Sequence, residues 1–224
     1  MQNDMRNIFT QDDFFKRIFM SLLGVIICAI SVAIFKIAAF GLDPFQTFMA
    51  GLNTVVPINF GTLYMISNIV LLIFIFILDK HYIGIATFIN LFLLGYITQF
   101  TYDFLQTIII DPSILVRAIC LAFAVIVICF GISFYMTASL GVSTYDAIAL
   151  IIVNTYHKGK FQYVRIISDI VCVIFGILLF LFANQSVKSI TALVGIGTVI
   201  TAFFMGPLIE FFSVHCARPF LNRR

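Results

Sequence analysis

A few polar side chains lie inside long apolar stretches of this sequence, and they are the residues that could do chemistry. They are Asp43, Gln46, Asn68, Asn90, Asp146, Asp169, Thr201 and Glu210. Polar groups inside a membrane are costly, and they usually face the interior of a helix bundle or a water-filled cavity. Carboxylates in such a place accept a cation or a proton, whereas amides and hydroxyls hydrogen-bond a polar ligand. We therefore predict that these residues bind a substrate.

Asp43 and Asp146 begin two short segments that follow glycine-containing breaks. A carboxylate at a helix N-terminus accepts backbone N–H bonds and interacts favourably with the helix dipole. Both acids therefore have two interpretations, as a structural cap or as the acceptor of a cation or proton. The cap interpretation is stronger for Asp43, because Asp146 lies further into its segment.

Asn68 and Asp169 lie seven or eight residues into their apolar segments, each directly after a serine. An isolated aspartate at this depth takes up a proton or recruits a cation. Asp169 is therefore the best candidate for an ionisable functional residue. Two structural alternatives remain. One is hydrogen bonding between helices, and the other is an ion pair with Arg165, four residues earlier on the same helix face.

Three more polar residues have a less definite role. Gln99 and Glu210 occupy matching places in the two halves of the chain, four residues after Gly95 and Gly206. A binding site and a structural hydrogen-bond network remain equal alternatives for this pair. Lys36 lies near the first break and has no counterpart, and we expect its ammonium group to extend to the outer membrane interface.

The composition is that of a membrane protein. The chain has 224 residues, of which 62% are hydrophobic and 10% are charged, and its mean hydropathy is +1.13. Soluble domains are about half apolar and a quarter charged. The five cysteines are scattered singly, and the sequence contains no metal-binding, phosphate-binding or nucleophile motif. We therefore expect a lipid bilayer as the partner, and no enzyme activity, cofactor, bound metal or nucleic acid.

Six segments are apolar and long enough to cross a bilayer, which takes about 20 residues. They are 17–39, 61–79, 83–107, 114–139, 162–183 and 189–213. Two further stretches, 44–56 and 144–156, have about 13 residues each and are too short to cross. The predicted fold is therefore a single membrane domain over residues 1–224. It is an all-α polytopic protein with six transmembrane helices and two short broken or re-entrant segments.

Positive charge predicts the orientation, because Lys and Arg concentrate in cytoplasmic loops. With six crossings and a cytoplasmic N-terminus, ten basic residues fall on the cytoplasmic side and three on the outer side. The three are Lys36, Arg117 and Lys188. We therefore expect a multi-pass protein of the bacterial inner membrane with both termini in the cytoplasm. A version with eight crossings also keeps the termini inside but moves Lys80 out, and it remains an alternative.

The two halves of the chain resemble each other. The segment 83–100 aligns with 194–211 without a gap, and seven positions are identical. Asn68 aligns with Asp169 in the segment before. This coincidence over consecutive segments indicates an internal duplication.

We define repeat 1 as residues 15–107 and repeat 2 as residues 114–213, with the breaks at Gly41 and Gly141 in matching places. Each repeat has three crossings, which is an odd number, so the second repeat must be inverted relative to the first. Inverted repeats with broken helices near the midplane are typical of secondary transporters.

Three stretches resemble a known family. They are "GLDPFQTFMAGL" at the first break, "GT" at 61–62 and "GIATFINLFLLG" at 84–95. These stretches are similar to the YczE/YyaS/YitT group of small bacterial inner-membrane proteins, and the resemblance extends over about 15–213. It implies a protein of about six helices with a transport or export role and no established catalytic residues. Gln46 stands where the group's pattern would place an acid, and Asp146 occupies the matching place in repeat 2.

These features favour an inner-membrane transporter of a small polar or cationic molecule, working by alternating access between the two repeats. The intramembrane acids outnumber the cations, which favours a cationic substrate or proton coupling over an anion. One alternative is the substrate-binding membrane subunit of an ATP-driven importer, with an ATPase as partner. Another is a membrane scaffold for a different protein, without transport. The oligomeric state stays open, and a homo-oligomer is one of the arrangements that we consider.

Overall fold

The computed structural model describes residues 14–159, 161–183 and 194–222. Every regular element in these ranges is helical, as predicted, and six long apolar helices could each span a membrane by length and composition. They are α2 (Phe14–Ala38), α4 (Phe60–Leu78), α5 (Ile85–Ile108), α6 (Ile114–Thr137), α8 (Phe161–Phe182) and α10 (Ile196–Phe212). The start of the sixth predicted segment, at 189–193, lies outside the described residues.

Short helices connect or extend the long ones. They are α3 (Pro44–Val55), η1 (Lys80–Tyr82), α7 (Thr144–Leu150), η2 (Ile151–Thr155), η3 (Ser213–Ala217) and α11 (Arg218–Asn222). The first predicted short stretch is α3, and the second is α7 together with the π-helical turn η2. Twelve residues of helix extend about 18 Å, which is shorter than the hydrocarbon core of a bilayer. The prediction of six long helices and two short ones is therefore confirmed.

The long helices expose large apolar side chains on the outside of the molecule. Phe76 on α4, Phe182 on α8 and Phe203 on α10 are 66%, 79% and 65% exposed. An apolar surface of this extent is a liability in water, whereas lipid chains cover it in a bilayer. The helices satisfy their own backbone hydrogen bonds, which is a requirement for any segment that contacts lipid.

The two breaks have the same backbone conformation. Ala39 and Gly41 have φ angles of 51° and 109°, and Ser139 and Gly141 have φ angles of 55° and 109°. Glycine adopts these left-handed values without a steric penalty. In both repeats the chain therefore turns in the same way before the short helix begins.

Each break docks on the third helix of the other repeat. A Cβ added to Gly41 would lie 2.6 Å from the backbone nitrogen of Gly195, which caps α10. A Cβ added to Gly141 would lie 2.6 Å from the backbone nitrogen of Gly84, which caps α5. Two backbone chains in contact leave no room for a side chain, so glycine is required at both breaks.

Matching backbone hydrogen bonds fix the two docked breaks. The amide of Gly197 donates to the carbonyl of Phe40 at 2.8 Å, and the amide of Ala86 donates to the carbonyl of Leu140 at 2.9 Å. The two bonds are equivalent when the repeats are exchanged. The break of each repeat is thus completed by the other repeat.

The central helices α2 and α6 show the same exchange. A Cβ on Gly24 would lie 2.7 Å from the carbonyl oxygen of Gly131, and the hydroxyl of Ser31 donates to the carbonyl of Ala124 at 2.7 Å. In the alignment of the repeats, position 24 matches position 124 and position 31 matches position 131. The contact of Gly24 with Gly131 is therefore equivalent to the contact of Ala124 with Ser31. This relation is that of a pseudo-two-fold axis between the helices, and it confirms the predicted inverted repeats.

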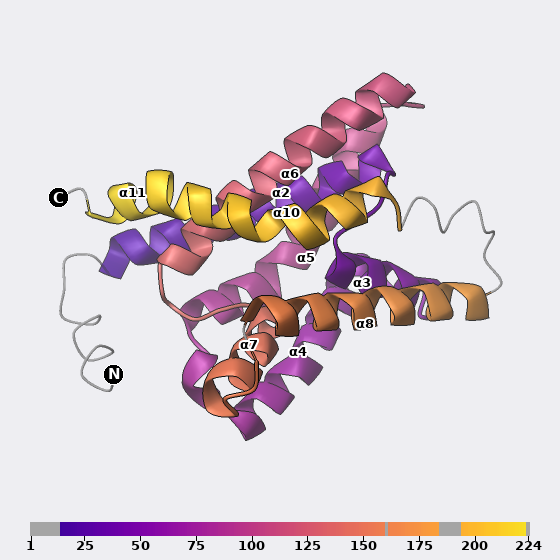
Figure 1. The fold of residues 1–224 in the computed structure, drawn as a ribbon. Helices are drawn as coiled ribbons and strands as arrows, with labels where there is room; N and C mark the ends of the chain where they lie inside the picture. Colours follow the sequence, from indigo (N-terminus) through magenta and orange to yellow (C-terminus); the bar gives the residue numbers. More distant parts are fainter. Residues whose placement is uncertain (1–13, 160, 184–193, 223–224) are drawn as a thin grey trace.

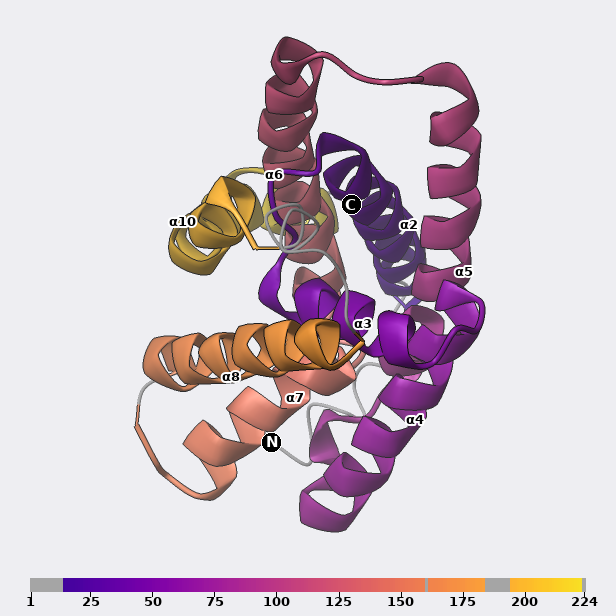
Figure 2. The ribbon, with the colours of Figure 1, turned by 90° about the vertical axis from the view of Figure 1, so that its right-hand side faces the viewer.

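The two short helices pack differently on their neighbours. A Cβ on Gly51 of α3 would lie 2.9 Å from the Cα of Gly176 of α8, so these helices touch through their backbones. The matching contact between α7–η2 and α4 is made by Ile151 and Ile75, which are both buried. Figures 1 and 2 show α3 in the middle of the molecule, with α2, α6 and α10 on one side and α8, α7 and α4 on the other. The structure is therefore tightly closed at α3–α8 and more widely spaced at α4–α7.

Candidate functional site

A cavity of about 90 Å³, lined by both polar and apolar side chains, lies between the two breaks. One water molecule needs only about 10–15 Å³ by this measure, so the cavity is large enough for several waters or a small solute. The predicted residues that line it are Asp43, Gln46, Asn68, Asn90 and Asp146. The structure thus brings together residues from both breaks and from helices α4 and α5.

Asp43 is both a helix cap and part of the cavity wall. Its Oδ1 accepts a hydrogen bond from the amide of Gln46 at 3.2 Å, and Pro44 occupies the first helical position. Proline suits this position because its missing N–H would have no partner there. Ser143 caps α7 in the same way, and its Oγ accepts from the amide of Asp146 at 3.1 Å. The cap interpretation therefore applies to Asp43 and not to Asp146.

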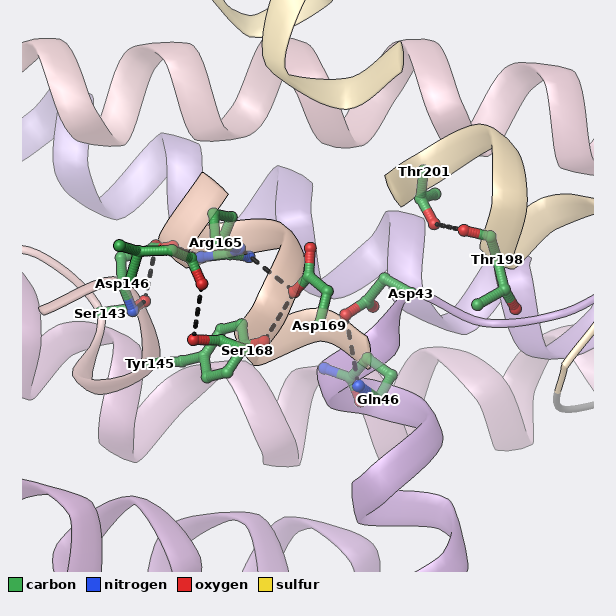
Figure 3. A network of polar contacts seen from close by, with 11 residues as sticks. Asp43, Gln46, Ser143, Tyr145, Asp146, Arg165, Ser168, Asp169, Thr198 and Thr201 are labelled. Carbon is green, nitrogen blue, oxygen red and sulfur yellow. Dashed lines mark hydrogen bonds and ion pairs between the residues drawn. The ribbon is translucent and has the colours of Figure 1, made fainter. Parts of the chain in front are cut away.

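Asp146 and Asp169 share one guanidinium group. Arg165 forms an ion pair with the Oδ1 of Asp146, and its Nε lies 3.3 Å from the Oδ1 of Asp169. The Tyr145 hydroxyl donates to the same Asp169 oxygen at 2.6 Å, and the Ser143 hydroxyl donates to Asp146 at 2.7 Å. Figure 3 shows this charged cluster on one side of Asp43 and Gln46. Asp169 joins the site through Arg165 and Tyr145 and does not line the cavity.

Arg165 is the centre of the cluster, although the sequence suggested only a structural pair with Asp169. Its guanidinium carbon lies 4.3 Å from the centre of the Tyr145 ring. Tyr145 in turn stacks on Phe45, with ring centroids 4.8 Å apart and planes 20° apart. Phe45 and Tyr145 occupy matching places in the two repeats, so this stacked pair lies where the repeats meet. Cation–π contact and two carboxylates together hold the guanidinium in place.

Helices α4 and α5 contribute uncharged hydrogen-bonding groups to the cavity wall. The Asn68 amide donates to the carbonyl of Tyr64 at 2.7 Å and accepts from the hydroxyl of Thr144. The Tyr64 hydroxyl donates to the Oδ1 of Asn90 at 3.3 Å. These residues are satisfied by one another.

Two buried polar atoms at the cavity are not satisfied. The Oε1 of Gln46 and the hydroxyl of Tyr135 have no hydrogen-bond partner within the part of the chain that the structure describes. Both side chains line the cavity, and the residues are 4% and 3% exposed. A buried polar atom without a partner costs about 1–3 kcal/mol, so these atoms favour a polar occupant.

Two predicted residues lie away from the cavity. Thr201 is buried on α10, and its hydroxyl donates to the carbonyl of Thr198 at 3.0 Å. The side chain of Glu210 is 68% exposed and lies 3.5 Å from Arg218. Neither residue lines the cavity, and Figure 3 shows Thr201 and Thr198 apart from the charged cluster. The structure therefore does not support their grouping with the other candidates.

Gln99 and Lys36 also lie outside the cavity. Gln99 donates to Asp103 at 2.7 Å on the exposed side of α5. The ammonium of Lys36 lies 3.3 Å from the centre of the Phe60 ring. Within the described ranges, no group of three His, Cys, Asp or Glu side chains is arranged to hold a metal ion. The chemistry of the cavity therefore rests on carboxylates, amides, hydroxyls and one guanidinium.

The comparisons with known proteins match a family of unknown function and an uncharacterized protein of similar length. The "Uncharacterized protein YyaS" of Bacillus subtilis (strain 168) is 22% identical over 201 residues, which cover 90% of this chain and 94% of that protein. No solved structure matches the chain. The YyaS part of the resemblance has this support, and the wider grouping with YczE and YitT proteins stays a prediction. The "Family of unknown function (DUF6198)" matches residues 15–214. The chain therefore belongs to the DUF6198 family.

Proposed function

We propose that this protein transports a small polar or cationic molecule across the bacterial inner membrane by alternating access of its two inverted repeats. The observation that carries the proposal is the cavity between the two breaks, with Asp43, Gln46 and Asp146 in its wall. Transporters built from inverted repeats bind their substrates at such a place, where broken helices meet.

The unsatisfied atoms at the cavity favour transport over a scaffold role. A scaffold needs no ligand, so its buried polar groups would all bond one another. Instead, Gln46 and Tyr135 present polar atoms to the cavity that no described protein group satisfies. Both atoms suit a ligand that enters and leaves.

The two halves also differ in packing at matching positions. Helices α3 and α8 touch at Gly51 and Gly176, whereas α7–η2 and α4 are held apart by Ile151 and Ile75. Alternating access requires a second conformation in which the cavity opens to the opposite side. The proposal therefore predicts a second state with a looser α3–α8 contact.

Cys28 offers a native probe for the two states, because it lines the cavity and is 6% exposed. In the test, the other four cysteines are replaced by serine. They are Cys120, Cys129, Cys172 and Cys216. A membrane-impermeant thiol reagent is then applied to vesicles of each orientation. We expect Cys28 to react from both sides, since each state opens the cavity to one side.

A matched variant that keeps Cys216 as its one cysteine provides the control. Cys216 lies in η3, at the end of the last membrane-spanning helix, and should react from one side only. With the proposed cytoplasmic C-terminus, that side is the cytoplasmic one. Reaction of Cys28 from a single side under all conditions would refute alternating access.

A further inference from the structure

The two repeats carry different groups at three matching positions around the cavity. The pairs are Gln46 and Asp146, Tyr64 and Arg165, and Asn68 and Asp169. Repeat 2 thus has two acids and a base where repeat 1 has three uncharged groups. Repeat 2 supplies its own cation, and repeat 1 supplies none.

Repeat 2 shows how this fold holds an organic cation. The guanidinium of Arg165 lies between the carboxylates of Asp146 and Asp169 and over the ring of Tyr145. Its charge is balanced, its N–H groups have acceptors, and its flat face contacts an aromatic ring. These are the three requirements for binding a planar cation away from water.

Repeat 1 offers the same kind of acceptors without a cation. Asp43 lines the cavity and forms no ion pair within the described ranges. The buried Oε1 of Gln46 is without a partner there, and so is the hydroxyl of Tyr135, which reaches the cavity from α6 of repeat 2. Arg165 is already shared by two other carboxylates, so the charge of Asp43 is not balanced by it. A carboxylate removed from water needs a proton or a cation nearby.

The helix N-terminus at the cavity does not favour an anion in this case. The positive end of a half-helix attracts anionic substrates in some transporters. Here the carboxylate of Asp43 already occupies the N-terminus of α3, where it accepts the Gln46 amide. The chain itself therefore supplies the anion at this N-terminus, and the carboxylate of Asp43 presents its negative charge to the cavity.

We infer that the repeat 1 side of the cavity binds a compact organic monocation with N–H donors, of the guanidinium or primary ammonium class. This inference rests on the proposed function and names its substrate class. The charge of the ligand is balanced by Asp43, and its N–H groups donate to Gln46 Oε1 and the Tyr135 hydroxyl. A volume of about 90 Å³ suits a small cation.

Protection of Cys28 from alkylation measures this binding without any transport. The variant with Cys28 as its single cysteine is purified in detergent, and its reaction with an uncharged maleimide is followed. Guanidinium chloride at millimolar concentration is the probe, and urea is its uncharged analogue of the same shape. We expect guanidinium to slow the alkylation at least fivefold, and sodium chloride and urea to have no effect.

Three substitutions connect the protection to the named groups. Asp43→Ser keeps a capping hydroxyl, as Ser143 does in repeat 2, and should raise the half-protecting concentration about 30-fold, because the ligand loses its charge partner. Gln46→Glu introduces an acid at the place of Asp146 and should lower that concentration. Glu210→Gln removes an exposed carboxylate outside the cavity and should leave it unchanged.

Several outcomes would overturn the inference. They are equal protection by urea, protection by formate in place of guanidinium, and protection that survives Asp43→Ser. If Cys28 is alkylated too slowly to be followed, thermal unfolding provides a second measurement. Guanidinium should raise the melting temperature of the single-cysteine variant relative to sodium chloride, and should not raise that of Asp43→Ser. Absence of both effects refutes the inference. If guanidinium binds but Cys28 reacts from one side only, the proposed transport fails and the binding site stands.

Discussion

Replacement of Arg165 by tyrosine tests the balance of charges in the cluster. Arg165 makes ion pairs with Asp146 and Asp169, and the three side chains are 26%, 18% and 10% exposed. Removing one partner of a buried ion pair costs about 3–5 kcal/mol, because the remaining charges stay buried without compensation. The partial exposure of these side chains places the expected loss of unfolding free energy at the lower end, about 3 kcal/mol.

The residues of repeat 1 indicate which further substitutions should restore the lost stability. It has Gln46, Tyr64 and Asn68 at the three matching places, and the amide of Asn68 is satisfied by its neighbours. The triple variant Asp146→Gln, Arg165→Tyr, Asp169→Asn therefore replaces the charged set by a neutral set that this fold already accommodates. We expect the triple variant to recover at least half of the lost stability, because no charge remains buried alone.

Equilibrium unfolding in mixed detergent micelles, followed by far-ultraviolet circular dichroism, measures both variants against the wild type. The single variant should be clearly less stable than the triple variant, although the triple variant changes more residues. If Arg165→Tyr costs less than about 0.5 kcal/mol, the ion pairs do not stabilise the fold. If the triple variant is as unstable as the single one, uncompensated charge is not the cause of the loss.

The remaining predictions concern the backbone and one exposed carboxylate. Gly41→Ala should lower the unfolding free energy by about 1–3 kcal/mol or more, because the φ of Gly41 is 109° and an added Cβ would clash with the start of α10. Gly206→Ala, where no described residue lies within 4 Å of an added Cβ, should instead raise it by up to about 1 kcal/mol. Unfolding of the two variants in micelles gives the comparison, and equal effects would contradict the packing argument. The Thr155 hydroxyl and the His81 amide lower the pKa of Asp79, so the bond that joins Asp79 to Thr155 should persist from pH 8 to 5 and be lost only as the pH falls through that lowered pKa. Hydrogen exchange of residues 151–159 measures it, and loss of protection near pH 5 would contradict this assignment.

The helices and breaks could be predicted because local chemistry determines them. Apolar stretches of about 20 residues have few alternatives to a membrane-spanning helix. Glycine followed by a capping residue, as at Gly41 with Asp43 and at Gly141 with Ser143, is a strong signal for a turn followed by a new helix. These signals act within a few residues, so they are readable without the fold.

The centre of the site could not be predicted in the same way. Arg165 and Asp169 are four residues apart on one helix, and that pair was visible. The pair of Arg165 with Asp146 joins α8 to α7, and only the packing of these helices creates it. Tyr145 and Phe45 were also missed, since 27 phenylalanines and 8 tyrosines give a single aromatic pair no distinction in the sequence.

Glu210 and Thr201 show the limit of reasoning from the repeats. Alignment of the repeats gives the position of a residue along a helix, but the face that it occupies depends on how that helix is rotated in the bundle. The side chain of Glu210 is 68% exposed, and Thr201 bonds to its own helix. The position along the helix was predictable for both residues, whereas contact with the cavity was not.

The exchange of breaks between the repeats also sets an order for assembly during synthesis. The second break needs the carbonyl of Leu140 and the amide of Ala86, and the ribosome has made both by the time Leu140 is added. The first break needs the amide of Gly197, which is synthesised more than 150 residues after Phe40. The first turn of the protein to enter the membrane is therefore among the last to reach its final contacts, and a ribosome-bound chain that ends before α10 leaves the carbonyl of Phe40 without its native partner.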